Sequence, residues 1–126
     1  MDTWLAEWIA KAEADYRTME REAAVLVEPS PESVCFHAQQ CAEKYLKARV
    51  VAAGTEPSRT HSLLQLLSEA EAHESMWTAF AADLAFLATF AVRVRYPGEA
   101  PTDEDAAEAV AACRRFRAAA RTALGL

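Results

Sequence analysis

The sequence predicts an all-α fold, an up-and-down bundle of about five helices in which residues 1–126 form one domain. Apolar residues recur at intervals of three and four along every long segment, whereas the alternation typical of strands is nearly absent. Ala, Leu, Glu and Arg, which are common in helices, dominate the composition. The length suits a single domain, and 52% apolar with 25% charged residues is typical of globular rather than disordered chains.

The first helix is expected over residues 3–26. Its apolar stripe is widened by Trp4 and Trp8 and otherwise consists of Leu5, Ile9, Ala12, Tyr16, Met19, Ala23 and Leu26. Residues 28–31 interrupt the chain, with Ser30 as an N-cap and Pro31 in the first turn of a second helix. Gly54 stands where a C-cap would end that second helix.

Three further helices are expected after residue 60. The third covers about residues 61–72 and directs four leucines toward the core, namely Leu63, Leu64, Leu66 and Leu67. The fourth covers about residues 75–95 and is apolar nearly all round, which predicts a helix that is central or faces a partner. Pro97 and Gly98 end it, and Thr102 caps a fifth helix that is acidic in its first turn.

The charge balance argues against binding through a broad basic surface. Nineteen acidic and thirteen basic residues give a net charge of −6, which repels phosphate backbones and anionic membranes, so any nucleic-acid contact must be local. The densest basic run is predicted to be a solvated helix face and consists of Arg114, Arg115, Arg117 and Arg121. Asp83 lies within the most apolar stretch, residues 76–94, which therefore predicts a buried helix and no membrane span.

Neither a metal nor a cofactor is predicted. Cys35, Cys41 and Cys113 contain no C-x-x-C pair, and the three histidines lack the i, i+4 spacing of a helical zinc pair. The glycines form no phosphate-binding loop. A Ser-His or Cys-His nucleophilic pair stays open. The cysteine usage and the absence of a signal peptide at the N-terminus favour a reducing cytoplasm.

The second helix carries an unusual set of side chains. Its core face is expected to consist of Val34, Ala38, Cys41, Ala42, Tyr45, Ala48 and Ala52. Phe36, Gln40, Glu43 and Lys47 share the opposite side, where an aromatic ring among polar groups indicates an interface with a second subunit. The alternative is that Phe36 packs under a loop of its own chain.

Two histidines near this helix have open roles. His37 lies with Lys44 along the boundary of the two faces, and it could act as a base, bind phosphate or be a buried hydrogen-bonded group. His61 opens the third helix, where the positive helix end could help to hold an anion or the side chain could cap the helix.

Several strings resemble the HEPN family. They are Cys35-Phe36-His37-Ala38-Gln39-Gln40-Cys41-Ala42-Glu43-Lys44-Tyr45-Leu46-Lys47-Ala48, then Gly54, then Arg59-Thr60-His61-Ser62-Leu63, and finally Arg95-Tyr96-Pro97-Gly98. The resemblance covers nearly the whole chain. It implies an up-and-down helical bundle, dimerisation, nucleotide or RNA chemistry, and a place in a prokaryotic defence or toxin–antitoxin module beside a minimal nucleotidyltransferase.

The family's ribonuclease motif is missing from this sequence. Many HEPN proteins are metal-independent ribonucleases that use an arginine, four to six further residues and a histidine, with two copies meeting across the dimer. No histidine stands at that distance after Arg93, Arg95 or any other arginine here. Loss of a general acid–base group costs roughly 10²–10⁴-fold in rate, whereas arginines can still bind phosphate.

Three functional hypotheses follow. The first is a non-catalytic, homodimeric module that binds a nucleotide or RNA and pairs with a nucleotidyltransferase. It has no catalytic residue, and its interface candidates are Phe36, Gln40 and Glu43. Its candidate nucleotide- or phosphate-binding residues are His37, Lys44, Lys47, Arg59, His61, Arg93, Arg95 and Tyr96. The second is a ribonuclease in which His37 or His61 replaces the missing histidine. The third is a structural subunit without a ligand, in which Tyr96 packs on the bundle.

Overall fold

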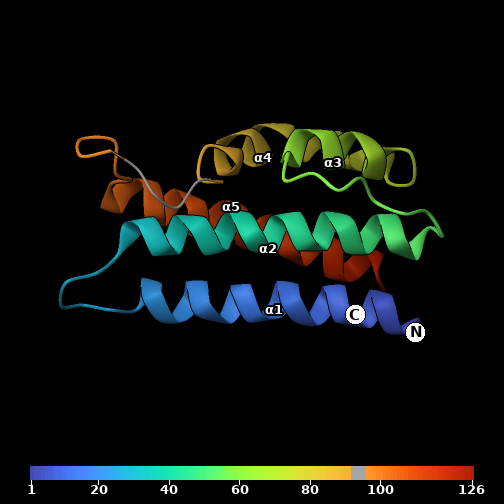
Figure 1. Ribbon diagram of the computed structural model, residues 1–126, viewed down its shortest axis with the longest axis horizontal. Coiled ribbons are helices and arrows are strands. Elements are labelled where there is room, and N and C mark those ends of the chain that lie inside the picture. Colours follow the sequence, from blue (N-terminus) through green and yellow to red (C-terminus); the bar gives the residue numbers. More distant parts are fainter. Residues whose placement is uncertain (92–95) are drawn as a thin grey trace.

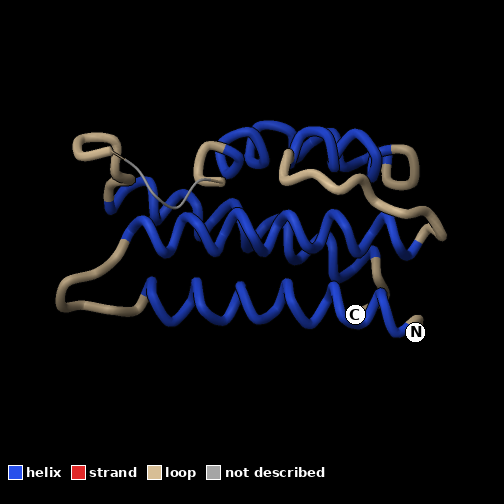
Figure 2. The backbone as a smooth tube through the Cα atoms, in the orientation of Figure 1, coloured by secondary structure: helices blue, strands red, loops and turns tan. Residues whose placement is uncertain are grey.

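The computed structural model describes residues 1–91 and 96–126, and every regular element in them is helical (Figures 1 and 2). The elements in chain order are α1 (Thr3–Ala23), α2 (Pro31–Ala52), α3 (Leu63–Glu71), the 3₁₀ helix η1 (Ser75–Phe80), α4 (Ala81–Ala88) and α5 (Asp103–Ala123). The predicted all-helical bundle is confirmed. The predicted binding residues Arg93 and Arg95 lie outside the described residues.

The helix ends follow the capping residues of the sequence. Ser30 accepts a hydrogen bond from the backbone N–H of Ser33 at 3.3 Å, and Pro31 begins α2. Thr102 and Asp105 form a reciprocal capping box at the start of α5, with distances of 2.9 and 3.0 Å. Gly54 follows α2 with a φ of 81°, a left-handed conformation that favours glycine.

Helix α2 lies at the centre of the molecule. It packs against α1 on one side, against α5 on another, and against α3 and α4 on a third (Figure 1). The core around it contains large side chains from all five α-helices, including Met19, Tyr45, Leu46, Leu63, Leu66, Leu84, Leu87 and Phe116. Phe116 contacts the rings of Trp77 and Phe80 edge-to-face, at centroid distances of 5.0 and 5.4 Å.

This central position corrects the predicted faces of the second helix. Glu43 and Lys47 were expected on a solvent-facing side, but they are only 2% and 7% exposed. The prediction is wrong because helices pack against α2 from several directions, and the polar side chains are buried with partners of their own. Ala52, assigned to the core face, is exposed at the last turn.

The fourth helix is shorter and less central than predicted. The segment begins as η1 without a side-chain cap, becomes α-helical only at Ala81 and ends at Ala88. The Thr89 hydroxyl donates to the Phe86 carbonyl at 2.8 Å, a local bond that competes with helix continuation. The segment is amphipathic rather than buried all round, since Met76 is 81% exposed.

Two leucines expected in the core are at the surface. Leu26 is 92% exposed because α1 ends at Ala23, three residues earlier than the apolar stripe predicted. Leu64 is 47% exposed on the outer side of α3, whereas its neighbours Leu63, Leu66 and Leu67 are buried.

The arginines of α5 connect the helices instead of forming a merely solvated face. Arg114 binds Glu20 with two hydrogen bonds, Arg115 binds Asp83 in the same way, and Arg117 binds Glu13. Each pair joins α5 to α1 or α4, and the planar guanidinium matches the carboxylate through two parallel bonds. These ion pairs hold the outer surfaces of the bundle in register.

No helix in the described part of the chain is long and apolar enough to cross a membrane.

Candidate functional site

A pocket of about 360 Å³ opens between the start of α1, the end of α2 and the loop that leads to α3. These segments lie together at the end of the bundle that also carries the N-terminus (Figure 1). The residues lining it are Trp4, Trp8, Lys47, Glu56, Pro57, Ser58, Arg59 and His61. We call this the Trp pocket. Three of the predicted phosphate-binding candidates, Lys47, Arg59 and His61, therefore meet in one site.

The loop that supplies Arg59 and His61 is held to the bundle at several points. Pro57 is buried, and the backbone N–H of Ser58 donates to the carboxylate of Glu69 on α3 at 3.0 Å. Helix α3 begins only at Leu63, because the Ser62 hydroxyl caps it by accepting from Gln65. The predicted role of His61 as the first residue of that helix is therefore wrong, and its ring points instead to a carboxylate of α2.

Two tryptophans form the aromatic wall of the Trp pocket. Trp4 and Trp8 stand four residues apart on α1, and Trp4 is 42% exposed. The ammonium group of Lys47 lies 5.2 Å from the centroid of the Trp8 ring, a cation–π contact. The Trp8 indole N–H is buried and has no hydrogen-bond partner among the described residues. The pocket thus combines aromatic faces with cations.

A buried carboxylate lies behind the cations of the Trp pocket. Glu43 of α2 accepts from Gln39 at 3.3 Å and from Lys47 at 3.4 Å, and one of its oxygens lies 3.2 Å from Nδ1 of His61. A carboxylate with only 2% exposure needs such donors to offset the loss of water. Glu43 therefore orients Lys47 and His61 and is not presented to a second subunit.

His37 and Lys44 belong to a different cluster. Both bind the carboxylate of Asp15 on α1, the histidine through Nδ1 at 2.8 Å and the lysine through its ammonium group. Neither residue lines the Trp pocket. Of the alternatives for His37, this placement matches a partly buried hydrogen-bonded group that helps to join α1 to α2.

The remaining candidates are scattered. Tyr96 is 78% exposed, which does not fit the expectation that it packs on the bundle. Phe36 is half-buried, and its ring meets that of His37 edge-to-face at 5.3 Å. Gln40 donates to Gln39 at 2.7 Å.

Several groups with shifted pKa values lie where α1, α2 and α5 meet. The hydrogen bonds from Arg117 lower the pKa of Glu13 to about 2, with a further contribution from the Tyr45 hydroxyl. A hydrogen bond to Cys113, together with burial, raises the pKa of the Cys41 thiol well above its usual range. A thiol held in its neutral form is a poor nucleophile, so Cys41 is not suited to a Cys-His pair.

Trp4 and Trp8 line the pocket but are not among the binding candidates that the sequence predicts. Both were assigned to the apolar stripe of the first helix, since their spacing fits a core face. A signal was present in the sequence, because two large aromatics near a helix start exceed what the stripe requires. That they face the loop carrying Arg59 depends on how α1 is oriented about its own axis in the bundle, which the structure shows.

Comparison with known proteins supports one family. The family model described as HEPN domain matches residues 5–122, nearly the whole chain. No curated protein matches the sequence. Among solved structures, the crystal structure of TT1696 from Thermus thermophilus is similar, with a TM-score of 0.80 and 23% identity over 94% of this chain and 97% of that one. At this identity the likeness establishes the shared fold.

Proposed function

The chain belongs to the HEPN domain family, and we propose that it is a non-catalytic module that binds a nucleotide or an RNA end in the Trp pocket. The observation that supports this proposal is the lining of one cavity. Lys47 on α2 lies there with Arg59 and His61 of the following loop and with two tryptophans of α1. Aromatic faces stack on any base, and each stacked base contributes roughly 1–3 kcal/mol.

The roles of the individual side chains follow from their chemistry. Trp4 and Trp8 offer the base a stacking surface. The guanidinium of Arg59 can bind a phosphate through two parallel hydrogen bonds. Lys47 is partly neutralised by Glu43, so Arg59 is assigned the larger share of phosphate binding.

Isothermal titration calorimetry tests this function with AMP, ATP and a short single-stranded oligoadenylate as probes. Wild type should bind at least one of them, and Arg59→Ala should bind about tenfold more weakly, since a hydrogen bond to a charged group contributes roughly 1.5–3 kcal/mol. Arg17→Ala is the matched control, because this arginine is exposed on α1 and does not line the pocket. Absence of heat with every probe, or equal affinity in Arg59→Ala, would reject the proposal.

The proposal extends to partners. A HEPN module of this kind is expected to form a homodimer and to act with a minimal nucleotidyltransferase in a prokaryotic toxin–antitoxin or defence module in the cytoplasm. The supporting observation is the family match alone. Sedimentation of the purified chain and co-purification with the product of the adjacent reading frame test these two parts separately.

A ribonuclease is the second candidate, favoured by one feature of the Trp pocket. Glu43 lies 3.2 Å from Nδ1 of His61, an arrangement that leaves Nε2 available for proton transfer beside Lys47 and Arg59. If this pair is catalytic, RNA is cleaved in the presence of EDTA and His61→Ala abolishes the cleavage. His73→Ala is the matched control on an exposed histidine. Cleavage that survives in His61→Ala rejects the ribonuclease.

A further inference from the structure

A second cavity lies at the opposite end of α2 from the Trp pocket. It measures about 370 Å³ and is lined by the end of α1, the α1–α2 connection, the first turn of α2 and the first two turns of α5. On α2 the groove is lined by Val34 and the Trp pocket by Lys47, 13 residues further along, so the two sites are about 20 Å apart along the helix. We call this cavity the apolar groove.

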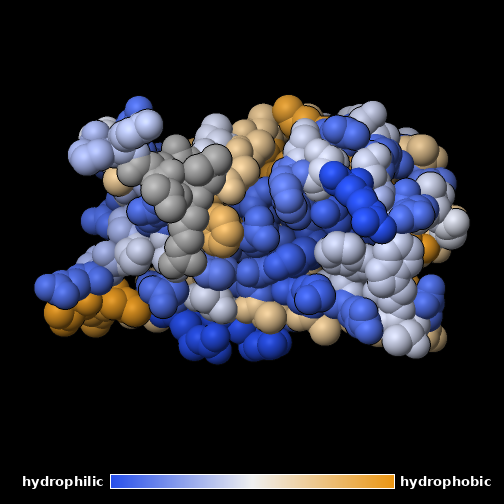
Figure 3. Space-filling model, in the orientation of Figure 1, coloured by the Kyte–Doolittle hydropathy of each residue, from blue (hydrophilic) through white to orange (hydrophobic). Residues whose placement is uncertain are grey.

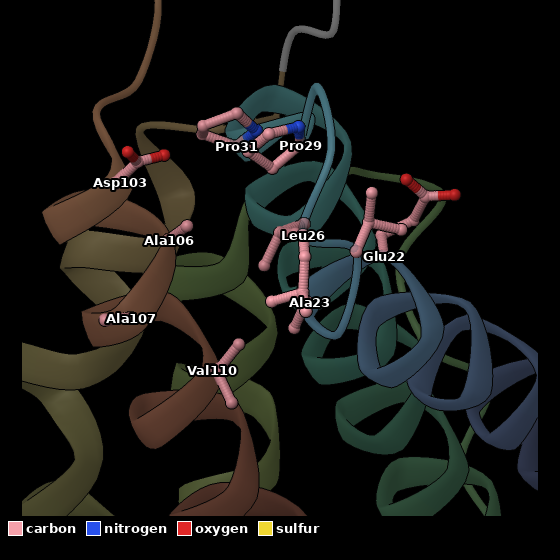
Figure 4. Close-up of a pocket in the computed structure, with 11 residues that line it drawn as sticks. Glu22, Ala23, Leu26, Pro29, Pro31, Asp103, Ala106, Ala107 and Val110 are labelled. Carbon is pink, nitrogen blue, oxygen red and sulfur yellow. The ribbon is translucent and has the colours of Figure 1, made fainter.

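Short aliphatic side chains form most of the apolar groove. Leu26 and Val110 project into the space between the α1–α2 connection and α5 (Figure 4), and Pro29 and Pro31 form its upper wall. Proline has no backbone N–H, so this wall offers no donors there. A polar small molecule needs several convergent polar groups, whereas this groove suits aliphatic side chains.

The α1–α2 connection beside the groove exposes an unusual apolar run. Val25, Leu26 and Val27 are 39%, 92% and 82% exposed, and orange atoms gather over this connection in Figure 3. The next residue, Glu28, has a φ of 50°, a left-handed conformation that is costly for a residue other than glycine. Three consecutive exposed apolar residues that continue into a groove are typical of a protein-binding surface.

The rim of the groove is acidic. Glu22 and Asp103 lie on opposite sides of it (Figure 4), and among the described residues that line it no side chain is basic. Glu104 and Asp105 follow Asp103 in the same turn of α5. If two copies of the chain packed groove against groove, their acidic rims would face each other, and the like charges would repel.

From the apolar floor and the acidic rim we propose that the groove binds a segment of a different protein, one that presents aliphatic side chains flanked by lysine or arginine. The aliphatic side chains enter between Leu26 and Val110, and the flanking cations meet Glu22 and Asp103. This surface is separate from the Trp pocket, so the chain can bind a partner protein at one end and a nucleotide at the other.

The test uses two labelled synthetic helical peptides and fluorescence anisotropy. Both carry leucines on one face, and the other face carries lysines in the first peptide and glutamates in the second. The lysine peptide should bind at least about tenfold more tightly than the glutamate peptide, because only its charges complement the rim. Glu22→Lys should reduce that preference, and a lysine near the end of α1 is compatible with its helix dipole.

Point variants locate the peptide on the groove. Leu26→Ser should weaken binding of the lysine peptide about tenfold, and the fold should persist because Leu26 is exposed. Met76→Ser is the matched control, another exposed apolar residue outside the groove, and it should bind as wild type does. The peptide assay contains no nucleotide, so failure of the nucleotide proposal would not affect this result.

Four outcomes would overturn the inference. They are equal binding of the two peptides, unchanged binding in Leu26→Ser, loss of binding in Met76→Ser, and sedimentation in which wild type self-associates while Leu26→Ser is monomeric. The last outcome would assign the groove to a second copy of the chain.

Discussion

Glu43 and His61 join the centre of the bundle to its surface, with 3.2 Å between a carboxylate oxygen of Glu43 and Nδ1 of His61. The Glu43 side chain is 3% exposed and that of His61 is 83% exposed. The same carboxylate accepts hydrogen bonds from the side chains of Gln39 and Lys47. The buried side chain of Glu43 thus contacts two side chains of the Trp pocket.

Removal of this carboxylate should be strongly destabilising. Glu43→Ala leaves the ammonium group of Lys47 buried without its partner, and breaking a buried pair in this way costs roughly 3–5 kcal/mol. Glu43→Gln keeps an acceptor oxygen and should cost less. Urea unfolding of both variants measures the loss, and a loss below about 1 kcal/mol in Glu43→Ala would contradict the role assigned to Glu43.

The ion pairs of α5 should differ in strength according to their burial. A double-mutant cycle on Glu13 and Arg117, whose side chains are 20% and 26% exposed, should give a coupling energy above about 1 kcal/mol. The matched pair Glu20 and Arg114 is more exposed, at 34% and 55%, and should give roughly 0.2–1 kcal/mol. Equal coupling energies would show that partial burial of the first pair has no effect on its strength.

Acid should remove part of the stability through Glu13. Its pKa is lowered from 4.5 to about 2 in the folded protein, chiefly by Arg117, so folding favours the ionised form. The resulting stabilisation is complete above pH 4.5 and is lost as the pH falls toward 2. Its size is at most about 3 kcal/mol.

The comparison of wild type with Glu13→Gln isolates this contribution. Between about pH 5 and pH 2 the unfolding free energy of wild type should fall more steeply than that of the variant, as measured by urea titration at each pH. Parallel pH profiles would mean that Glu13 does not gain its lowered pKa on folding.

The turn after α2 should require glycine. Gly54 has a φ of 81°, and no atom lies within 4 Å of the position of an added Cβ, so the cost of Gly54→Ala is backbone strain alone. A loss of about 1 kcal/mol is expected, with a smaller loss for Gly54→Asn, because asparagine tolerates this conformation better. Thermal unfolding measures both, and an unchanged midpoint in Gly54→Ala would contradict the prediction.

Local signals in the sequence predicted most of the fold. Ser30, Pro31, Gly54 and Thr102 act through neighbouring residues in the chain, and all four mark helix ends as expected. The burial of Glu43 could not be predicted in this way. It depends on how several helices surround α2, which no local pattern in the sequence encodes.

The candidate site was only partly predictable for the same reason. Arg59 and His61 were singled out by their chemistry, and the structure brings them to Lys47. Trp4 and Trp8 fit a core stripe equally well, so their place in the pocket depends on the rotation of α1 against α2. The apolar groove escaped prediction because the stripe of the first helix extends three residues beyond the end of α1 at Ala23.

A nucleotide bound between the tryptophans and Arg59 would change the surroundings of the indole N–H groups, whose NMR signals can be followed in a ¹⁵N-labelled sample. The chain has three tryptophans, and Trp77 is buried against Phe116, away from the Trp pocket. Signals are assigned from Trp4→Phe, Trp8→Phe and Trp77→Phe. On titration with AMP, ATP or oligoadenylate, the signals of Trp4 and Trp8 should shift while that of Trp77 stays in place. No shift with any of these ligands, or a shift of Trp77 alone, would contradict the account.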